Sequence, residues 1–147
     1  MTDAEAHDGS LGLMRWIMWE QRRQGEAWVS ERDLTHEQSA VLAFLAQTPG
    51  VIQRDIARIT RTSAPSVSRL LAGLESRGLV ERRLEDDDAR SRRVFATPAA
   101  LQLISGFSSA MQAIENSILG SLDATERDTL HGLLVKVTAS LPVPSFD

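Results

Sequence analysis

Apolar residues recur with a helical period through most of the chain, beginning at Ser10. The preceding residues 1–9 are small and acidic and have no such period, so they predict a disordered tail. From Ser10 to Trp28, apolar side chains occur around most of the helix circumference. Such a helix must be buried on more than one side, and we expect it to contact two partners.

Three shorter helices are predicted next. Thr35 and Gln38 form a capping box that starts the first of them, and Pro49-Gly50 ends it. The other two cover Ile52 to Thr60 and Ser63 to Arg77, with a break between them. Two helices that meet at a tight turn are typical of a helix-turn-helix.

A strand pattern begins after Gly78, the expected end of the last of these helices. Leu79 to Leu84 alternates apolar and charged residues, and an acidic turn at Glu85 to Asp88 follows. A return strand over Ser91 to Thr97 completes the expected hairpin.

Two helices are predicted after the hairpin. The first runs from Pro98 to Gly120 as one helix, because its apolar residues recur at steps of three and four. The second follows a capping box formed by Asp123 and Glu126 and ends at Pro142.

This order of elements predicts a mainly α fold with a small β-hairpin wing. The winged helix-turn-helix DNA-binding domain would cover residues 34–97, and residues 10–33 and 98–147 would form a helical dimerisation region. In such domains the second helix of the pair enters the major groove, and the hairpin reaches the flanking minor groove.

The same region resembles the MarR family of bacterial transcription regulators from about Leu34 to Ala100. The matching residues, in order, are Leu34-Thr35, Gln38, Val41-Leu42, Asp55-Ile56-Ala57, Val67-Ser68-Arg69-Leu70, Leu74-Glu75, Gly78-Leu79-Val80, Arg82, Asp88, Arg90 and Thr97. Three positions depart from the family pattern: Arg61 stands where a turn Gly is common, Ala96 replaces a Leu, and Ala100 replaces a Gly. None of them removes a charge used on DNA.

Net charge is –4 for the whole chain, which by itself would disfavour binding to nucleic acid. The charge is unevenly distributed, however. From Gln53 to Arg93 there are ten Arg against seven Asp and Glu, a net +3, and the rest of the chain has a net –7. Attraction to phosphate acts locally at the docking face, so a basic centre within an acidic chain is compatible with DNA binding.

Base and phosphate contacts are expected from the first two turns of the predicted recognition helix. Short hydroxyl side chains allow close approach there, and Arg can fork onto guanine or onto a phosphate. Ser63 has the alternative of capping the helix. The residues expected at this surface are Ser63, Pro65, Ser66, Ser68 and Arg69.

In the wing, Arg90 suits a narrow A/T-rich minor groove, and Arg92 or Arg93 could reach a phosphate. Only one of these two should face DNA, because side chains alternate along a strand. The resemblance implies a structural role for Asp88. We expect it to brace the wing by pairing within it or with Arg77.

The flanking helices have more apolar surface than a small winged domain can cover, so a homodimer is expected. The resemblance implies intertwined helices and a cleft that binds small anionic aromatic effectors. The expected walls and anchors of that cleft are Met14, Arg15, Trp16, Met18, Trp19, His36 and Phe44. The alternative is that these residues are dimer-interface core.

Other classes of function lack support in the sequence. There is no Cys, no HExxH or GxSxG motif and no phosphate loop, so we expect neither an enzyme nor a cofactor or metal site. No membrane span or signal peptide is predicted, and the cytoplasm is the expected location. A winged helix that contacts only proteins is the alternative, which the basic wing argues against.

Overall fold

The computed structural model describes residues 9–84 and 92–142, which form seven helices and three short strands. The prediction of a mainly α fold with a small β-hairpin is confirmed. In chain order the elements are α1 (Ser10–Ser30), α2 (His36–Gln47), β1 (Val51–Ile52), α3 (Gln53–Thr60), α4 (Ala64–Ser76), β2 (Val80–Leu84), β3 (Arg92–Ala96), α5 (Pro98–Leu103), α6 (Phe107–Ile118) and α7 (Ala124–Ala139).

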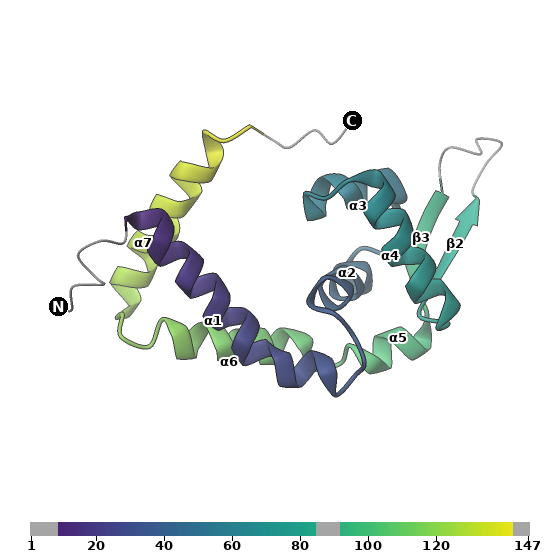
Figure 1. Ribbon diagram of the computed structural model, residues 1–147, viewed down its shortest axis with the longest axis horizontal. Helices are drawn as coiled ribbons and strands as arrows, with labels where there is room; N and C mark the ends of the chain where they lie inside the picture. The colour runs from purple at the N-terminus through teal and green to yellow at the C-terminus, as the bar shows by residue number, and fades with distance from the viewer. Residues whose placement is uncertain (1–8, 85–91, 143–147) are drawn as a thin grey trace.

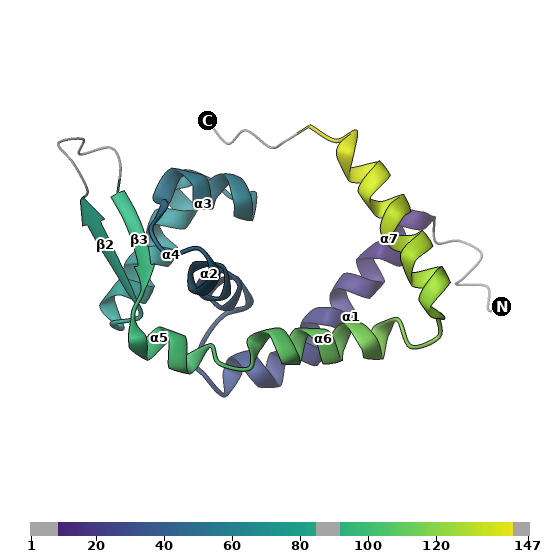
Figure 2. The same cartoon turned by 180° about the vertical axis from the view of Figure 1, so that it is seen from behind.

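The elements form two parts joined by a pair of helices (Figure 1 and Figure 2). At one end, α2, α3, α4 and the sheet form the winged part, with α5 beside it. From there α1 and α6 run side by side toward the other end, where α7 lies.

One hydrophobic core holds the winged part together. It is made by aliphatic side chains from α2, α3, α4 and both long strands, and each such side chain stabilises the fold by about 1.5–3 kcal/mol on burial. Its most completely buried members are Leu42, Leu45, Ile56, Leu71, Leu74, Val80 and Val94.

Side-chain caps set several helix ends where the sequence predicted them. The Thr35 hydroxyl accepts a hydrogen bond from the Gln38 amide, and the Gln38 side chain accepts one from the Thr35 amide, each at 3.0 Å. Asp123 and Glu126 form the same reciprocal pair at the start of α7. Both capping boxes are therefore confirmed.

The sheet is antiparallel in the order β1-β3-β2. Its hairpin pairs Val80 with Ala96 and Arg82 with Val94, close to the predicted strands. The strand β1 was not predicted, and placing Ile52 at the start of a helix was wrong, because α3 begins at Gln53. A two-residue strand has too little sequence for a period, and here it exists because Val51 pairs with Val94 on β3.

The prediction of one helix from Pro98 to Gly120 was also wrong. The chain breaks after α5, and Gly106 takes a left-handed conformation with φ 84° and ψ –2° before α6 begins. Ile104, ahead of the break, is buried in the core of the winged part, whereas Phe107, after it, packs against Trp28 of α1. The break separates α5, which packs on α2 and β3, from α6, which runs along α1, although the apolar spacing continues through it.

Aromatic and cationic contacts join α1 to α5 and α6. The Trp28 and Phe107 rings meet edge to face with centroids 5.4 Å apart. The Arg32 guanidinium lies 3.7 Å from the centroid of the Trp28 ring and donates to the Leu103 carbonyl at 3.1 Å. These contacts set the angle at which α1 leaves the winged part.

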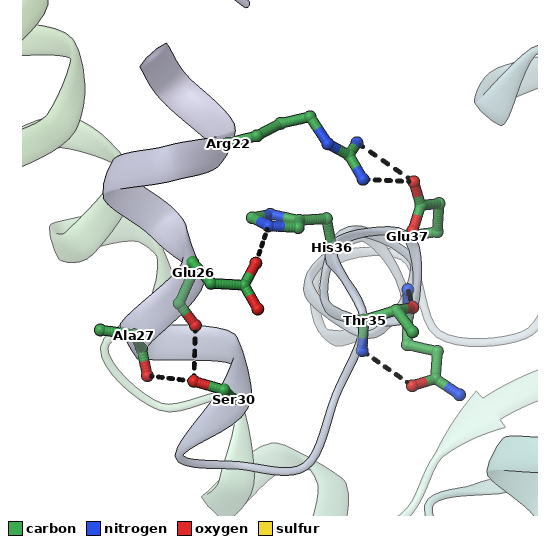
Figure 3. A network of polar contacts seen from close by, with 8 residues as sticks. Arg22, Glu26, Ala27, Ser30, Thr35, His36 and Glu37 are labelled. Atoms are coloured by element: carbon green, nitrogen blue, oxygen red, sulfur yellow. Dashed lines mark hydrogen bonds and ion pairs between the residues drawn. The ribbon is translucent and has the colours of Figure 1, made fainter. Parts of the chain in front are cut away.

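Polar contacts join α1 to the start of α2 (Figure 3). His36 Nε2 lies 3.1 Å from a carboxylate oxygen of Glu26, and both terminal nitrogens of Arg22 donate to Glu37 at 3.2 Å. A Cβ on Gly25 would lie 3.2 Å from the His36 ring, so the ring packs closely on the backbone of α1.

An ion pair ties the wing to α4. Arg82 of β2 donates from Nε and Nη2 to the two carboxylate oxygens of Glu75, both at 3.1 Å. The hydrogen bond from Arg82 is the main reason that the pKa of Glu75 lies below its usual value. The paired carboxylate must therefore be ionised for β2 to be held against the last turn of α4.

Replacement of Gly106 by Ala should lower the free energy of unfolding by about 1–2 kcal/mol, because an L side chain is strained at this positive φ. The space around the site is open, so the cost comes from the backbone alone. Gly73→Ala, within α4, is the matched control and should stabilise by about 0.5–1 kcal/mol. Urea unfolding checks both, and a neutral Gly106→Ala would mean that α5 and α6 form one helix.

Replacement of Glu75 by Gln should lower the Tm at neutral pH, because Arg82 loses its charged partner. Because the pKa of Glu75 is lowered in the folded state, its ionised carboxylate stabilises the fold fully at pH values above the ordinary pKa of 4.5. This stabilisation is lost as the pH falls through the folded-state pKa. The Tm difference from wild type should therefore persist down to about pH 4.5 and then disappear. Glu81→Gln, on the same strand, should change the Tm little, because its pair with Arg83 is exposed. A Tm difference for Glu75→Gln that did not vary with pH would contradict the role of this carboxylate.

Candidate nucleic-acid interface

The start of α4 is organised by two serine hydroxyls. Ser63 is the N-cap residue, and its hydroxyl accepts from the Ser66 amide at 3.2 Å while donating to the Ser66 hydroxyl at 2.8 Å. The structure therefore shows Ser63 capping α4, which was the alternative to a direct contact with DNA. Ser66 keeps its own hydroxyl proton for a further acceptor.

The outer face of α4 presents a cation to solvent. Val67, Leu71 and Leu74 are buried in the core, whereas Pro65 and Arg69, four residues apart on the same side of the helix, are exposed. Ser68 is half-buried beside them. Arg69 makes no hydrogen bond or ion pair with any residue that the structure describes, so its guanidinium is available to a partner.

The two arginines of β3 differ in exposure, as the alternation of side chains along a strand predicted. Arg93 is half-buried and donates to the Gly50 carbonyl at 2.9 Å, so it helps to hold the loop after α2. Arg92 is exposed. Arg92 is therefore the one of the pair that can meet a ligand.

Two of the expected wing residues, Arg90 and Asp88, lie outside the described residues. Arg77 donates to the backbone carbonyls of Asp33 and Arg32, joining the end of α4 to the loop between α1 and α2. The pairing of Asp88 with Arg77 stays a prediction. Sequence reasoning missed the Glu75–Arg82 pair, because a helix end and a strand give no regular spacing that would reveal such a contact.

Several arginines of the winged part form ion pairs or hydrogen bonds with described residues, and others do not. Arg58 pairs with Asp55 at 3.2 Å and Arg83 with Glu81 at 2.7 Å. Across residues 53–84 and 92–96, the exposed arginines with no hydrogen bond or ion pair to a described residue are Arg54, Arg61, Arg69 and Arg92. Arg54 and Arg61 were not predicted as site residues, although the departure from the family pattern at Arg61 was a usable signal.

The structure places the residues expected around an effector on α1 and α2. Trp16, Met18 and Trp19 are mostly exposed on α1, and Phe44 is half-buried on α2. A cavity of about 450 Å³ lies elsewhere, between the end of α1 and α5, and contains none of the expected residues. It is lined by Glu31, Arg32, Ala99, Gln102 and Leu103.

Within residues 9–84 and 92–142, no group of three or more His, Cys, Asp or Glu side chains is arranged to hold a metal ion. None of the helices in that part of the chain combines the length and apolar character that a membrane span requires.

Comparison with known proteins shows similarity to one family of regulators. Residues 32–91 match the sequence model of the MarR family. The transcriptional regulator HosA of Escherichia coli O127:H6 is 29% identical over 105 residues, which are 71% of this chain and 78% of that protein.

Solved structures agree with this match over nearly the whole chain. The chain of the S. aureus MepR–DNA complex is 28% identical with a TM-score of 0.84, and the match covers 92% of this chain and all of that one. A mutant of E. coli MarR in complex with operator DNA shares the fold, with 24% identity, a TM-score of 0.77, and coverage of 88% and 91% of the two chains. The chain is therefore similar to the MarR family of transcriptional regulators in sequence over residues 32–91 and in fold over nearly its whole length.

Proposed function

We propose that this protein is a sequence-specific DNA-binding repressor that binds a pseudo-palindromic site as a homodimer and is released by a small-molecule ligand. The observation that carries the proposal is the exposed face of α4, where Arg69 is a cation without a partner in the described structure. The similarity to a chain that is bound to DNA in the MepR complex supports the same function.

Base readout is assigned to the first turns of α4, the recognition helix. Arg69 would fork onto guanine or a phosphate, and Ser66 and Ser68 would supply short hydroxyls at close approach. Pro65 would contact the groove through its exposed ring. Ser63 would contribute by holding the start of the helix in place through its cap.

The wing would contact DNA beside the recognition helix. Arg92 is exposed at the first residue of β3 and would meet a phosphate, whereas Arg90 would enter the minor groove. The negative net charge of the whole chain does not oppose this contact, because the phosphates meet the basic centre and not the acidic ends.

A second copy of the chain would cover α7. No residue of this 16-residue helix is buried, and α7 makes no extensive contact with another described element. An isolated helix of this length is marginally stable in water, so the helix needs a packing partner. Its exposed apolar side chains are Leu133, Leu134, Val135 and Val137.

The start of α1 would join the same dimer interface. Leu11 is 77% exposed, and Trp16, Met18 and Trp19 are each more than half exposed. Together with α7, these side chains form an apolar surface within the region predicted for dimerisation. A two-fold dimer would set its recognition helices about 34 Å apart, one DNA turn, and this separation requires a pseudo-palindromic site.

The effector would be a small anionic aromatic molecule bound near α1. Arg15 is exposed with no hydrogen bond or ion pair to a described residue, whereas His36 is held by Glu26. Arg15 is therefore the better anchor for a carboxylate. Trp16, Met18, Trp19 and Phe44 would gather around such a ligand only when the second copy closes the site.

Replacement of Arg69 by Ala should weaken binding to DNA from the region upstream of the protein's own gene by about 1–3 kcal/mol and reduce base preference. Replacement of Arg92 by Ala should weaken binding equally for all sequences and lower the salt slope by about 0.9 for each lost contact. Fluorescence anisotropy over a range of salt concentrations measures both effects.

Arg23→Ala removes the same charge from the middle of α1, where Arg23 pairs with Glu20, and should leave DNA affinity unchanged. Adding benzoate to the wild-type complex examines release in the same assay. Wild-type protein that bound no DNA, or bound it regardless of Arg69 and Arg92, would favour a winged helix that contacts only proteins.

Replacement of Leu133 by Glu should convert the protein to a monomer at micromolar concentration, because a charge would be buried in the apolar interface. Sedimentation velocity without DNA measures the change. Leu84→Glu is the matched control, since Leu84 is 61% exposed on β2 in the winged part and should leave the dimer intact. A stable wild-type monomer would rule out the homodimer.

A further inference from the structure

The turn between α3 and α4 holds an arginine in a conformation that disfavours it. Arg61 has φ 54° and ψ 44°, in the left-handed region where the Cβ crowds the following carbonyl. The turn itself is closed by backbone hydrogen bonds, from the Arg61 amide to Arg58 at 3.4 Å and from the Thr62 amide to Ala57 at 3.1 Å. Gly usually fills such a C-terminal position. The fold requires the positive φ at this position and makes no use of a guanidinium there.

The Arg61 side chain also has no structural role among the described residues. It is exposed and makes no hydrogen bond or ion pair with them. Asp55, the acidic residue of α3, is already paired with Arg58 at 3.2 Å. The strain of an L side chain at this site is therefore not offset by any contact that the structure shows.

Its position relative to the recognition helix suggests what it contacts. Arg61 stands two residues before Ser63, the N-cap of α4, and Arg54 and Arg69 supply further unpaired cations from the helices on either side. We propose that Arg61 contacts a DNA phosphate and fixes the depth and angle at which α4 enters the groove. This inference rests on the proposed function.

The chemistry favours phosphate over a base. The residue lies ahead of the turns of α4 that would enter the groove, and a guanidinium presents a planar fork that matches phosphate oxygens. A contact of this kind positions the protein without reading sequence. It should therefore contribute equally to all DNA sequences and depend on salt.

Replacement of Arg61 by Gly separates the backbone strain from the phosphate contact. Loss of the strain should raise the Tm, whereas loss of the contact should weaken DNA binding. The variant should gain a few degrees in Tm and should bind DNA several-fold more weakly at each salt concentration. Its salt slope should fall by about 0.9 for each contact, or about 1.8 for a dimer. Arg61→Lys keeps both the charge and the strain and should retain most of the wild-type slope.

Asp33→Gly is the matched control, because Asp33 is the other non-glycine residue at positive φ among the described residues, with φ 51°. It lies in the turn after α1 and is exposed. This variant should also gain Tm, with no loss of DNA affinity. Thermal unfolding and anisotropy on the same preparations give both measurements.

The outcomes distinguish this inference from the function on which it rests. If wild type bound DNA and Arg69→Ala weakened it, while Arg61→Gly bound as wild type, the phosphate contact would be wrong and the regulator would stand. A fall in the Tm of Arg61→Gly would overturn the inference too, because the fold would then use the side chain. If wild type bound no DNA, both proposals would fail.

Discussion

The structure depends most on the contact where α1 leaves the winged part. There the Trp28 ring packs against Phe107 of α6 and beneath the guanidinium of Arg32, which also bonds the Leu103 carbonyl. Two segments distant in sequence, the end of α1 and the junction of α5 with α6, meet through these contacts. Because packed interiors yield little to strain, the direction of α1 and the placement of the winged part are set together. This contact therefore helps to fix how α1 and α6 lie relative to the winged part.

The break at Gly106 serves the same contact. Ile104 before the break is buried in the winged core, and Phe107 after it packs against the same core and against Trp28. The polar junction of His36 with Glu26 and of Arg22 with Glu37 adds a second attachment between α1 and α2. The helical region is thus tied to the winged part at two places, while α7 has no cover within the described chain.

The arginines of the winged part divide into those that build the fold and those that remain for a partner. Arg82 holds β2 to Glu75, and Arg93 holds the loop at Gly50. Arg69 and Arg92 are exposed, and neither has a hydrogen bond or ion pair within the described residues. A basic winged part inside an acidic chain therefore does not mean that every cation binds DNA. The arginines that the fold leaves unpaired are the ones we propose for DNA contact.

Sequence alone determined the local structure of this protein. Local structure depends on residues that are neighbours in the chain, as in the capping boxes at Thr35 and Asp123, the hairpin strands and the apolar faces of the helices. Residue spacings of two for strands and 3.6 for helices therefore predict it from the sequence. Tertiary structure alone decided the strand β1, the break at Gly106, the Glu75–Arg82 pair and which of Arg92 and Arg93 faces outward. Each of these depends on a contact between distant segments, whose free energy exists only after the chain has brought them together, so no local spacing encodes it.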